Sequence, residues 1–210
     1  MTTMQNPAQP AYPAYYDAVP AIVMMDPLAR LLGSAEEGLI EYRYIDAVKL
    51  TGHSCPTVAG AWLMTRCAME RLYPGGTPRR GGIRVELRQP LDEGVTGVVA
   101  SVAALVTGAA NAGGFKGLAG HFGRRDLLQF DVPLDGDIRF TRVDTAQAVE
   151  FVRRGLPAPH PAALSQLLRQ ALGPQASEDD RRAFAQAWGE RVAQIVHPGA
   201  AVEWVEVTVA

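Results

Sequence analysis

The alternation of hydrophobic and polar positions predicts both helices and strands along this chain. Apolar residues recur at helical spacing over residues 57–73 and 95–110, and they cover nearly every side of both segments. We therefore expect two buried helices. Strict alternation of apolar and charged residues over 83–88 predicts a half-buried strand. Two more strands are predicted at 127–132 and 138–143, and the Asp-Gly pair between them predicts a hairpin.

The C-terminal third of the chain is predicted to be a helical extension. Helices are predicted at 145–154, 161–172 and 179–195, and a valine-rich strand at 202–209 closes the chain. Together with the central order of helix, strand, helix, strand and strand, this predicts an α+β fold. We expect a single domain over residues 21–210, with a core at about 41–143 and an extension at 144–210.

The N-terminal side is less regular. Residues 1–20 hold four prolines and three tyrosines, which exclude a regular helix and favour an extended arm docked on a neighbouring surface. Residues 21–25 fit a strand and residues 27–32 an Asp-capped helix, and Ser34 and Glu37 form a predicted capping box. For residues 40–48 periodicity leaves both strand and helix open.

Composition and charge narrow the classes of function. The 210 residues are 48% hydrophobic and carry a net charge of −2, which is typical of a globular protein and argues against a nucleic-acid surface or an anionic-membrane anchor. Two cysteines do not form a disulfide framework, and the first residues lack the basic and apolar regions of a secretory signal. We expect a cytoplasmic protein.

The stretch with the most chemistry runs from Thr51 to Thr57. His53 and Cys55 stand two residues apart, just before Pro56, which suits the first position of a helix. Imidazole and thiolate are favoured ligands of zinc, so this spacing predicts half of a metal site. The alternative is a tight turn that enters a helix, with Cys55 as a small buried apolar group.

Two motifs resemble the FmdE family of formylmethanofuran dehydrogenase proteins. Gly52-His53-Ser54-Cys55-Pro56, followed by a helix that contains Gly60, is similar to the Gly-His-x-Cys-Pro-Gly signature of that family. Val106-Thr107-Gly108 and the segment 113–118 resemble its Leu-Thr-Gly and Gly-Lys-x-Asn-Leu segment. The resemblance covers roughly residues 41–132. It implies an α-β-α-β core around a mixed sheet and a link to one-carbon metabolism.

This sequence also departs from the family pattern. Family members often carry cysteine, aspartate and cysteine where Val98, Ser101 and Ala109 stand here, and some end in a four-cysteine zinc ribbon that this chain lacks. Only His53 and Cys55 therefore carry over as metal ligands.

The glycine-rich segment after residue 108 supplies the remaining candidates. We predict His121 as a third metal ligand; the alternative is a loop histidine that hydrogen-bonds to backbone. Lys116, with Gly114 and Gly117, is predicted to bind an anionic group of a small molecule. Asp46 is a candidate acceptor for His53. Zinc is the expected metal, and the ligand types also suit iron or copper.

Three functions follow from these residues. The first is a metal-binding, FmdE-like protein whose small-molecule pocket lies at the metal. The second is a metal or cofactor carrier, or an assembly factor, without turnover, and the third is a structural dimer. We expect a homodimer, because the apolar faces of 57–73 and 95–110 exceed what one small sheet covers. No general base accompanies the His-x-Cys motif, so no reaction is assigned.

Overall fold

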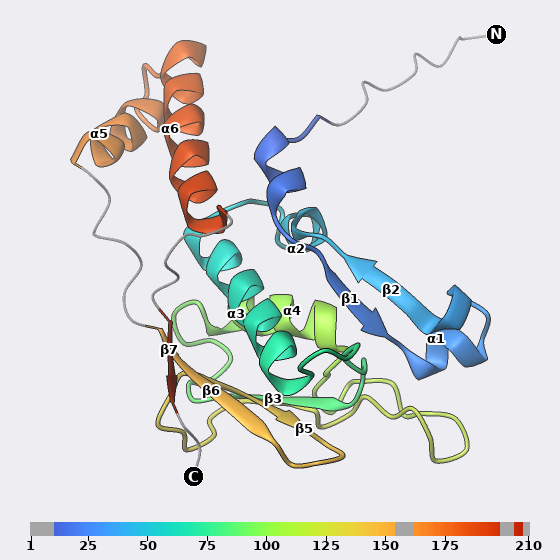
Figure 1. Ribbon diagram of the computed structural model, residues 1–210. Coiled ribbons are helices and arrows are strands. Elements are labelled where there is room, and N and C mark those ends of the chain that lie inside the picture. Colours follow the sequence, from blue (N-terminus) through green and yellow to red (C-terminus); the bar gives the residue numbers. More distant parts are fainter. Residues whose placement is uncertain (1–10, 154–161, 198–203, 208–210) are drawn as a thin grey trace, which may run out of the picture.

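The computed structural model describes residues 11–153, 162–197 and 204–207 (Figure 1). The fold is α+β, as predicted, and its main sheet is mixed. The order of strands in this five-stranded sheet is β4-β3-β5-β6-β7. Its strands are β3 (Ile83–Leu87), β4 (Leu128–Gln129), β5 (Ile138–Arg142), β6 (Ala148–Arg153) and β7 (Trp204–Val207). None of the helices in the described segments is long and apolar enough to cross a membrane.

One hairpin prediction and one helix prediction need correction. The hairpin expected between 127–132 and 138–143 does not form, because β3 lies between β4 and β5 and pairs with both, in parallel with β4 and antiparallel with β5. Most of the segment 145–154, where a helix was expected, forms strand β6 instead. Val149 and Phe151 point into the core while Glu150 faces the other way, so this segment has the two-residue period of a strand.

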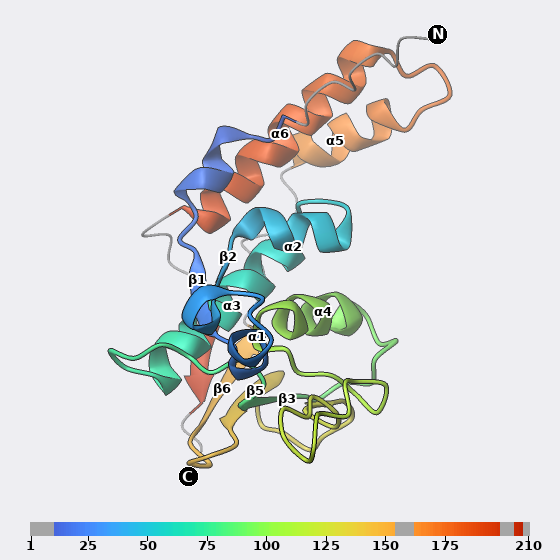
Figure 2. The ribbon, with the colours of Figure 1, turned by 90° about the vertical axis from the view of Figure 1, so that its right-hand side faces the viewer.

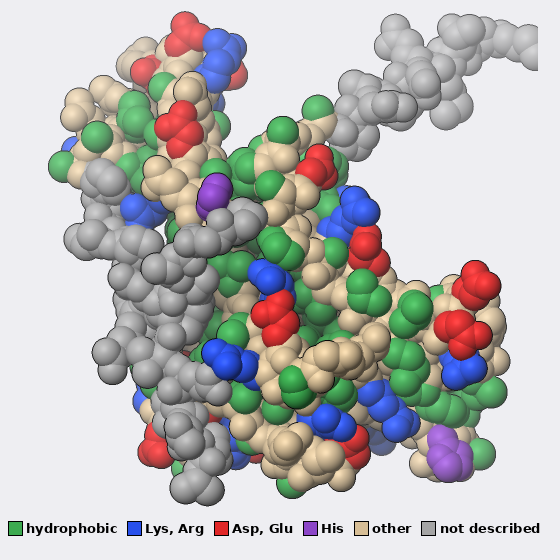
Figure 3. Space-filling model, in the orientation of Figure 1, with side chains coloured by type: hydrophobic (Ala, Val, Ile, Leu, Met, Phe, Trp, Pro, Cys, Tyr) green, Lys and Arg blue, Asp and Glu red, His purple; other side chains and the backbone are tan. Residues whose placement is uncertain are grey.

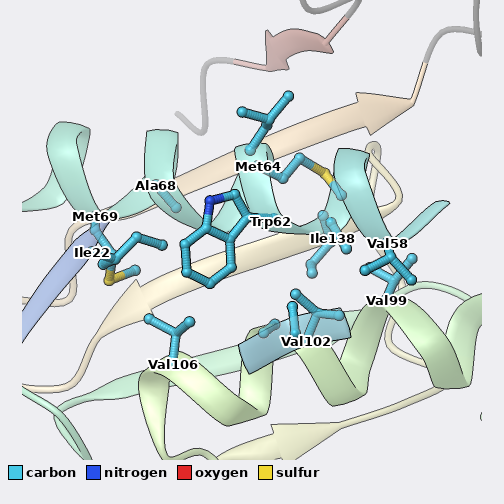
Figure 4. Packing of buried hydrophobic residues seen from close by; sticks show 14 of the residues in the cluster. Ile22, Val58, Trp62, Met64, Ala68, Met69, Val99, Val102, Val106 and Ile138 are labelled. Carbon is cyan, nitrogen blue, oxygen red and sulfur yellow. The ribbon is translucent and has the colours of Figure 1, made fainter. Parts of the chain in front are cut away.

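Helix α3 (Pro56–Leu72) is the centre of the core and lies against α4 (Thr96–Thr107) over one face of the sheet. Figure 4 shows Val58 of α3 beside Val99 of α4, and Trp62 facing Val102 and Val106. All of these side chains are buried. The apolar faces that suggested a dimer therefore pack against each other within one chain, and they leave no reason to expect association through these two helices.

The N-terminal segments form a second, smaller layer beside α4. Strands β1 (Ile22–Met25) and β2 (Leu39–Tyr42) make an antiparallel ribbon, joined by α1 (Pro27–Leu31) and η2 (Glu36–Gly38). Residues 40–48 divide between β2 and helix α2 (Tyr44–Thr51). The predicted capping box of Ser34 and Glu37 is wrong, since Ala35 precedes η2 without a side-chain cap and Glu37 has a positive φ.

The tyrosine-rich arm is docked where the structure describes it, from residue 11 onward. Its short helix η1 (Ala14–Ala18) brings Tyr16 against Tyr44, with ring centroids 5.2 Å apart. Residues 1–10 of the predicted arm lie outside the described residues.

Two C-terminal helices, α5 (Ala162–Ala171) and α6 (Glu178–Val196), confirm the predicted helices at 161–172 and 179–195. They form a hairpin that projects from the body, and α6 contacts α3 with its C-terminal half (Figures 1 and 2). Val192 and Val196 are buried there, whereas Ala185, in the first half of the helix, is exposed. The capping box of Ser177 and Asp180 begins α6, with Asp180 N donating to the Ser177 hydroxyl.

A buried carboxylate ties the small layer to the core. Asp26 caps α1 by accepting from Leu28 N and Ala29 N, and it also accepts from Arg80 at 3.1 Å and from Arg124 at 2.8 Å. Its side chain is 5% exposed and that of Arg124 is 8% exposed. Gly81 and Gly108, both at positive φ, leave the space that the Arg124 guanidinium fills, since a Cβ at either would collide with it.

We predict that Asp26→Ala lowers the free energy of unfolding by about 3–5 kcal/mol, because it leaves two buried or half-buried arginines without their counter-charge. Chemical denaturation measures this change. Glu37→Ala is the matched control, since Glu37 and its partner Arg30 are both more than 60% exposed; it should cost about 0–1 kcal/mol. Equal losses for the two variants would contradict the assignment.

The same cluster predicts acid sensitivity. Burial raises the pKa of Asp26, but the backbone hydrogen bonds, Arg124 and Arg80 outweigh it and hold this pKa below its usual range. The pKa of Glu86 is lowered in the same way. Burial raises this pKa, but the interactions with Arg139, Arg84 and Thr141 have the larger effect and lower it. A carboxylate whose pKa is lower in the folded state stabilises the fold at pH values above its unfolded-state pKa. This stabilisation is lost as the pH falls through the folded-state pKa.

The free energy of unfolding should therefore change little between about pH 5 and about pH 8 and fall with decreasing pH below about pH 4. Asp26→Asn should show a shallower fall, because one of the carboxylates that must take up a proton is gone. Denaturant titrations across this pH range test the point, and an unchanged slope in Asp26→Asn would rule out Asp26 as a source of the acid sensitivity.

Candidate functional site

The turn between α2 and α3 presents the predicted His53 and Cys55. Gly52 ends α2 with φ 76°, a left-handed conformation that reverses the chain. Cys55 then occupies the N-cap position of α3 and Pro56 its first turn, as the sequence predicted. No hydrogen bond joins the Cys55 side chain to the α3 backbone amides, and the thiol is half-buried.

The ring of His53 is oriented by its own turn. Nδ1 lies 2.9 Å from the carbonyl oxygen of Thr51. Because a carbonyl only accepts, Nδ1 carries a proton, and in the neutral ring the lone pair is then on Nε2. Asp46 is not the partner that the sequence suggested, since its carboxylate accepts from the backbone N–H of Arg43 and caps α2.

Ser54 fixes the turn on the body of the protein. Its hydroxyl lies 2.8 Å from the Tyr44 hydroxyl, and its carbonyl accepts from the indole N–H of Trp188 in α6. Burial raises the pKa of Tyr44, so its hydroxyl stays protonated and able to donate. The turn is thus held by one side chain from the first turn of α2 and by one from α6.

His121 lies in the loop of residues 108–127, which follows α4. Gly81 N donates to the carbonyl of Thr107 at the start of this loop, so the loop adjoins the chain that follows the C-terminal end of α3. His53 and Cys55 precede the N-terminal end of the same helix. Seventeen residues of α3 span roughly 25 Å, and Figure 1 shows the loop and the α2–α3 turn well apart.

The structure therefore does not bring His121 to His53 and Cys55. Its backbone N–H and C=O pair with those of Leu118, which makes it part of a tight turn. Among the described residues, no three His, Cys, Asp or Glu side chains converge as a group that would hold a metal ion. The predicted three-ligand zinc site does not fit the part of the chain that is described.

The two glycines predicted to approach a ligand pack against their own loop. A Cβ on Gly117 would collide with the carbonyl of His121, and one on Gly114 would meet Ala110 and lie 3.2 Å from the Arg124 backbone. Both are needed for the loop to close on itself. The side chain of Lys116 is exposed.

A cleft of about 400 Å³ opens elsewhere, where β3 ends and α4 begins. It lies between the helical layer and the sheet. The apolar part of its wall consists of Met64, Leu87, Val95, Val99, Ile138 and Val152. The polar part consists of Arg88, Gln89, Glu93, Thr96 and Asp137, with Gly94 between them. None of the residues predicted from the sequence as ligands lines this cleft.

Sequence reasoning overlooked the cleft, although a signal was present. In folds with helices on a sheet, ligands often bind beyond the carboxyl end of a strand, next to the start of the following helix. The polar connection of residues 88–95 has this position, since it joins β3 to α4. At its start the Arg88 guanidinium pairs with the Asp137 carboxylate at 2.5 Å, so two of the three charged side chains that line the cleft hold each other in place.

Comparisons with protein-family models, with curated proteins and with solved structures found no match for this chain. The resemblance to the FmdE family therefore stays a prediction, carried only by the motifs from which it was drawn.

Proposed function

We propose that this protein binds a small molecule in the cleft between the end of β3 and the start of α4. The single observation that carries the proposal is the cleft itself, with its volume of about 400 Å³ and its divided lining. Binding sites for small ligands are typically concave, within about 300–1,000 Å³, and mostly apolar with a few placed polar groups.

The lining indicates an amphipathic ligand. Met64 of α3, Val99 of α4 and Ile138 of β5 come from three different elements, so an apolar body would contact both layers at once. The polar groups are concentrated on the connection of residues 88–95 and at Asp137. Arg88 and the carboxylates of Glu93 and Asp137 leave the lining with a net charge of about −1. A ligand with an apolar body and several hydrogen-bonding groups fits this wall better than a strongly charged one.

The proposal predicts that Thr96→Trp fills the cleft and weakens ligand binding. The neutral dye Nile red is a suitable probe, because its fluorescence rises in an apolar site; wild type should bind it saturably. Thr96→Trp should weaken binding by about tenfold or more. Ser101→Trp is the matched control, since Ser101 lies on the exposed side of the same helix. Equal affinities for Thr96→Trp and Ser101→Trp would contradict the proposal.

A second candidate function is transition-metal binding at His53 and Cys55. The observation that favours it is the hydrogen bond from His53 Nδ1 to the Thr51 carbonyl, because metal-bound histidines usually have their second nitrogen fixed in this way. Cys55 supplies a half-buried thiol two residues away. Two donors leave other coordination positions to solvent or to a small ligand, with zinc as the expected metal. Such a protein would act as a carrier or assembly factor.

This candidate predicts that Cys55→Ser abolishes the thiolate absorption band that appears when cobalt(II) is added to the wild type. Cys67→Ser should keep the band, since Cys67 lies about three turns along α3. His121→Ala should also keep it, because the loop of residues 108–127 is remote from the turn. Loss of the band in His121→Ala would contradict a site made of His53 and Cys55 alone. Absence of the band in the wild type would rule out metal binding at this turn.

Two broader expectations from the sequence belong to the same proposal. A link to one-carbon metabolism rests on the two FmdE-like motifs. A cytoplasmic location rests on the low cysteine content, because two cysteines in 210 residues do not form the disulfide framework typical of secreted domains.

A further inference from the structure

One edge of the molecule combines two exposed segments. Helix α1 and the loop of residues 108–127 lie side by side in both views (Figures 1 and 2). Leu31 and Leu32, at the C-terminal end of α1, are 60% and 61% exposed. Phe115 and Leu118 of the loop are 43% and 42% exposed. We name this surface the edge face and define it by these four side chains.

The loop half of the edge face is ordered by its own hydrogen bonds. Ala110 O accepts from Leu127 N and Leu128 N, which closes the base of the loop, and Phe115 O accepts from Arg124 N. Ala119 and Phe122 have φ values of 47° and 62°, which is unfavourable for residues with a Cβ. Strained residues of this kind persist where the surrounding structure fixes them, and they cluster at functional surfaces.

The two halves are joined through the core. Arg124 of the loop pairs with Asp26, the N-cap of α1, at 2.8 Å, and both side chains are buried. The start of α1 and the base of the loop are therefore fixed relative to each other, which reduces the conformational entropy lost when both bind one partner.

The charges of the two halves are opposite. Glu36 and Glu37 follow α1 and are exposed, and Arg30 of α1 pairs with Glu37 at 2.9 Å, so these three side chains carry a net charge of −1. Residues 108–125 contain no acidic residue and expose Lys116 and Arg125. Figure 3 shows acidic side chains over the α1 and η2 end of this edge, with a basic side chain and hydrophobic side chains beside them. An acidic half and a basic half on one surface are complementary to the same surface turned by 180°.

We propose that the edge face docks a second copy of this chain in a two-fold symmetric dimer. Leu31 and Leu32 pack against the partner's Phe115 and Leu118, and Glu36 faces the partner's Lys116. Symmetry repeats each contact, so every favourable pair occurs twice. The charge complementarity selects this occupant over an unrelated protein. The proposal is independent of the ligand cleft, because no residue of the edge face lines it.

Charge reversal tests the proposal by sedimentation velocity over a concentration series. Wild type should sediment as a dimer at micromolar concentration. Glu36→Lys and Lys116→Glu should each raise the dimer dissociation constant by about tenfold or more, because each places two like-charged pairs across the two-fold axis. The double variant E36K/K116E, and an equimolar mixture of the two single variants, should recover dimerisation. Lys49→Glu, an exposed lysine on α2, is the matched control and should leave it unchanged.

Apolar substitutions give a second readout. Leu32→Ser and Leu118→Ser should shift the equilibrium toward monomer, whereas Leu172→Ser, at a side chain 77% exposed outside the edge face, should not. A wild type that stays monomeric throughout the series overturns the proposal. So does a dimer that tolerates both leucine substitutions, or a double variant that does not recover.

Discussion

The buried carboxylate of Asp26 is the interaction on which the arrangement of the N-terminal layer depends. It brings together three segments that are far apart in the sequence, through Asp26 itself, Arg80 and Arg124. Each guanidinium is buried or half-buried, so removal of the single negative charge leaves two cations in a medium that solvates them poorly. The position of α1, the path of the chain before β3 and the base of the loop of residues 108–127 all follow from this one contact.

Helix α4 connects that cluster to the ligand cleft. Its C-terminal end carries the partial negative charge of the helix dipole, and Arg80 donates there to the carbonyl of Leu105 at 3.2 Å. Its first turn, without a side-chain cap, borders the cleft. The C-terminal end of α4, which accepts from Arg80, is thus tied to the cluster around Asp26. The N-terminal end borders the cleft proposed for the ligand.

The sequence predicted those parts of the fold that local pattern determines. Periodicity located α3, β3, α4 and α6, because each buries a stripe or face with its own repeat. It misassigned β6, where the residues also suit a helix and only pairing with β5 selects the strand. The hairpin prediction failed for a related reason: the Asp-Gly pair permits a turn but does not determine which strand lies beside β5.

The candidate sites divide in the same way. The turn of His53 and Cys55 was predictable, because Gly52 and Pro56 are local signals for the end of one helix and the start of the next. The apolar wall of the cleft was not predictable, since Met64, Val99 and Ile138 converge only after the helices dock on the sheet. The prediction that His121 lies beside Cys55 was wrong. The residues around His121 give no information on its position in space, and in the fold the length of α3 separates the two side chains.

The most direct test of the proposed ligand site is the amide ¹H–¹⁵N spectrum of the protein recorded with and without Nile red. We predict that the largest chemical-shift changes fall on residues 88–96, which line the cleft, with little change at 53–55. Largest changes at residues 31–32 and 115–118, with 88–96 unaffected, would show that the dye binds the edge face and would contradict the cleft as the ligand site.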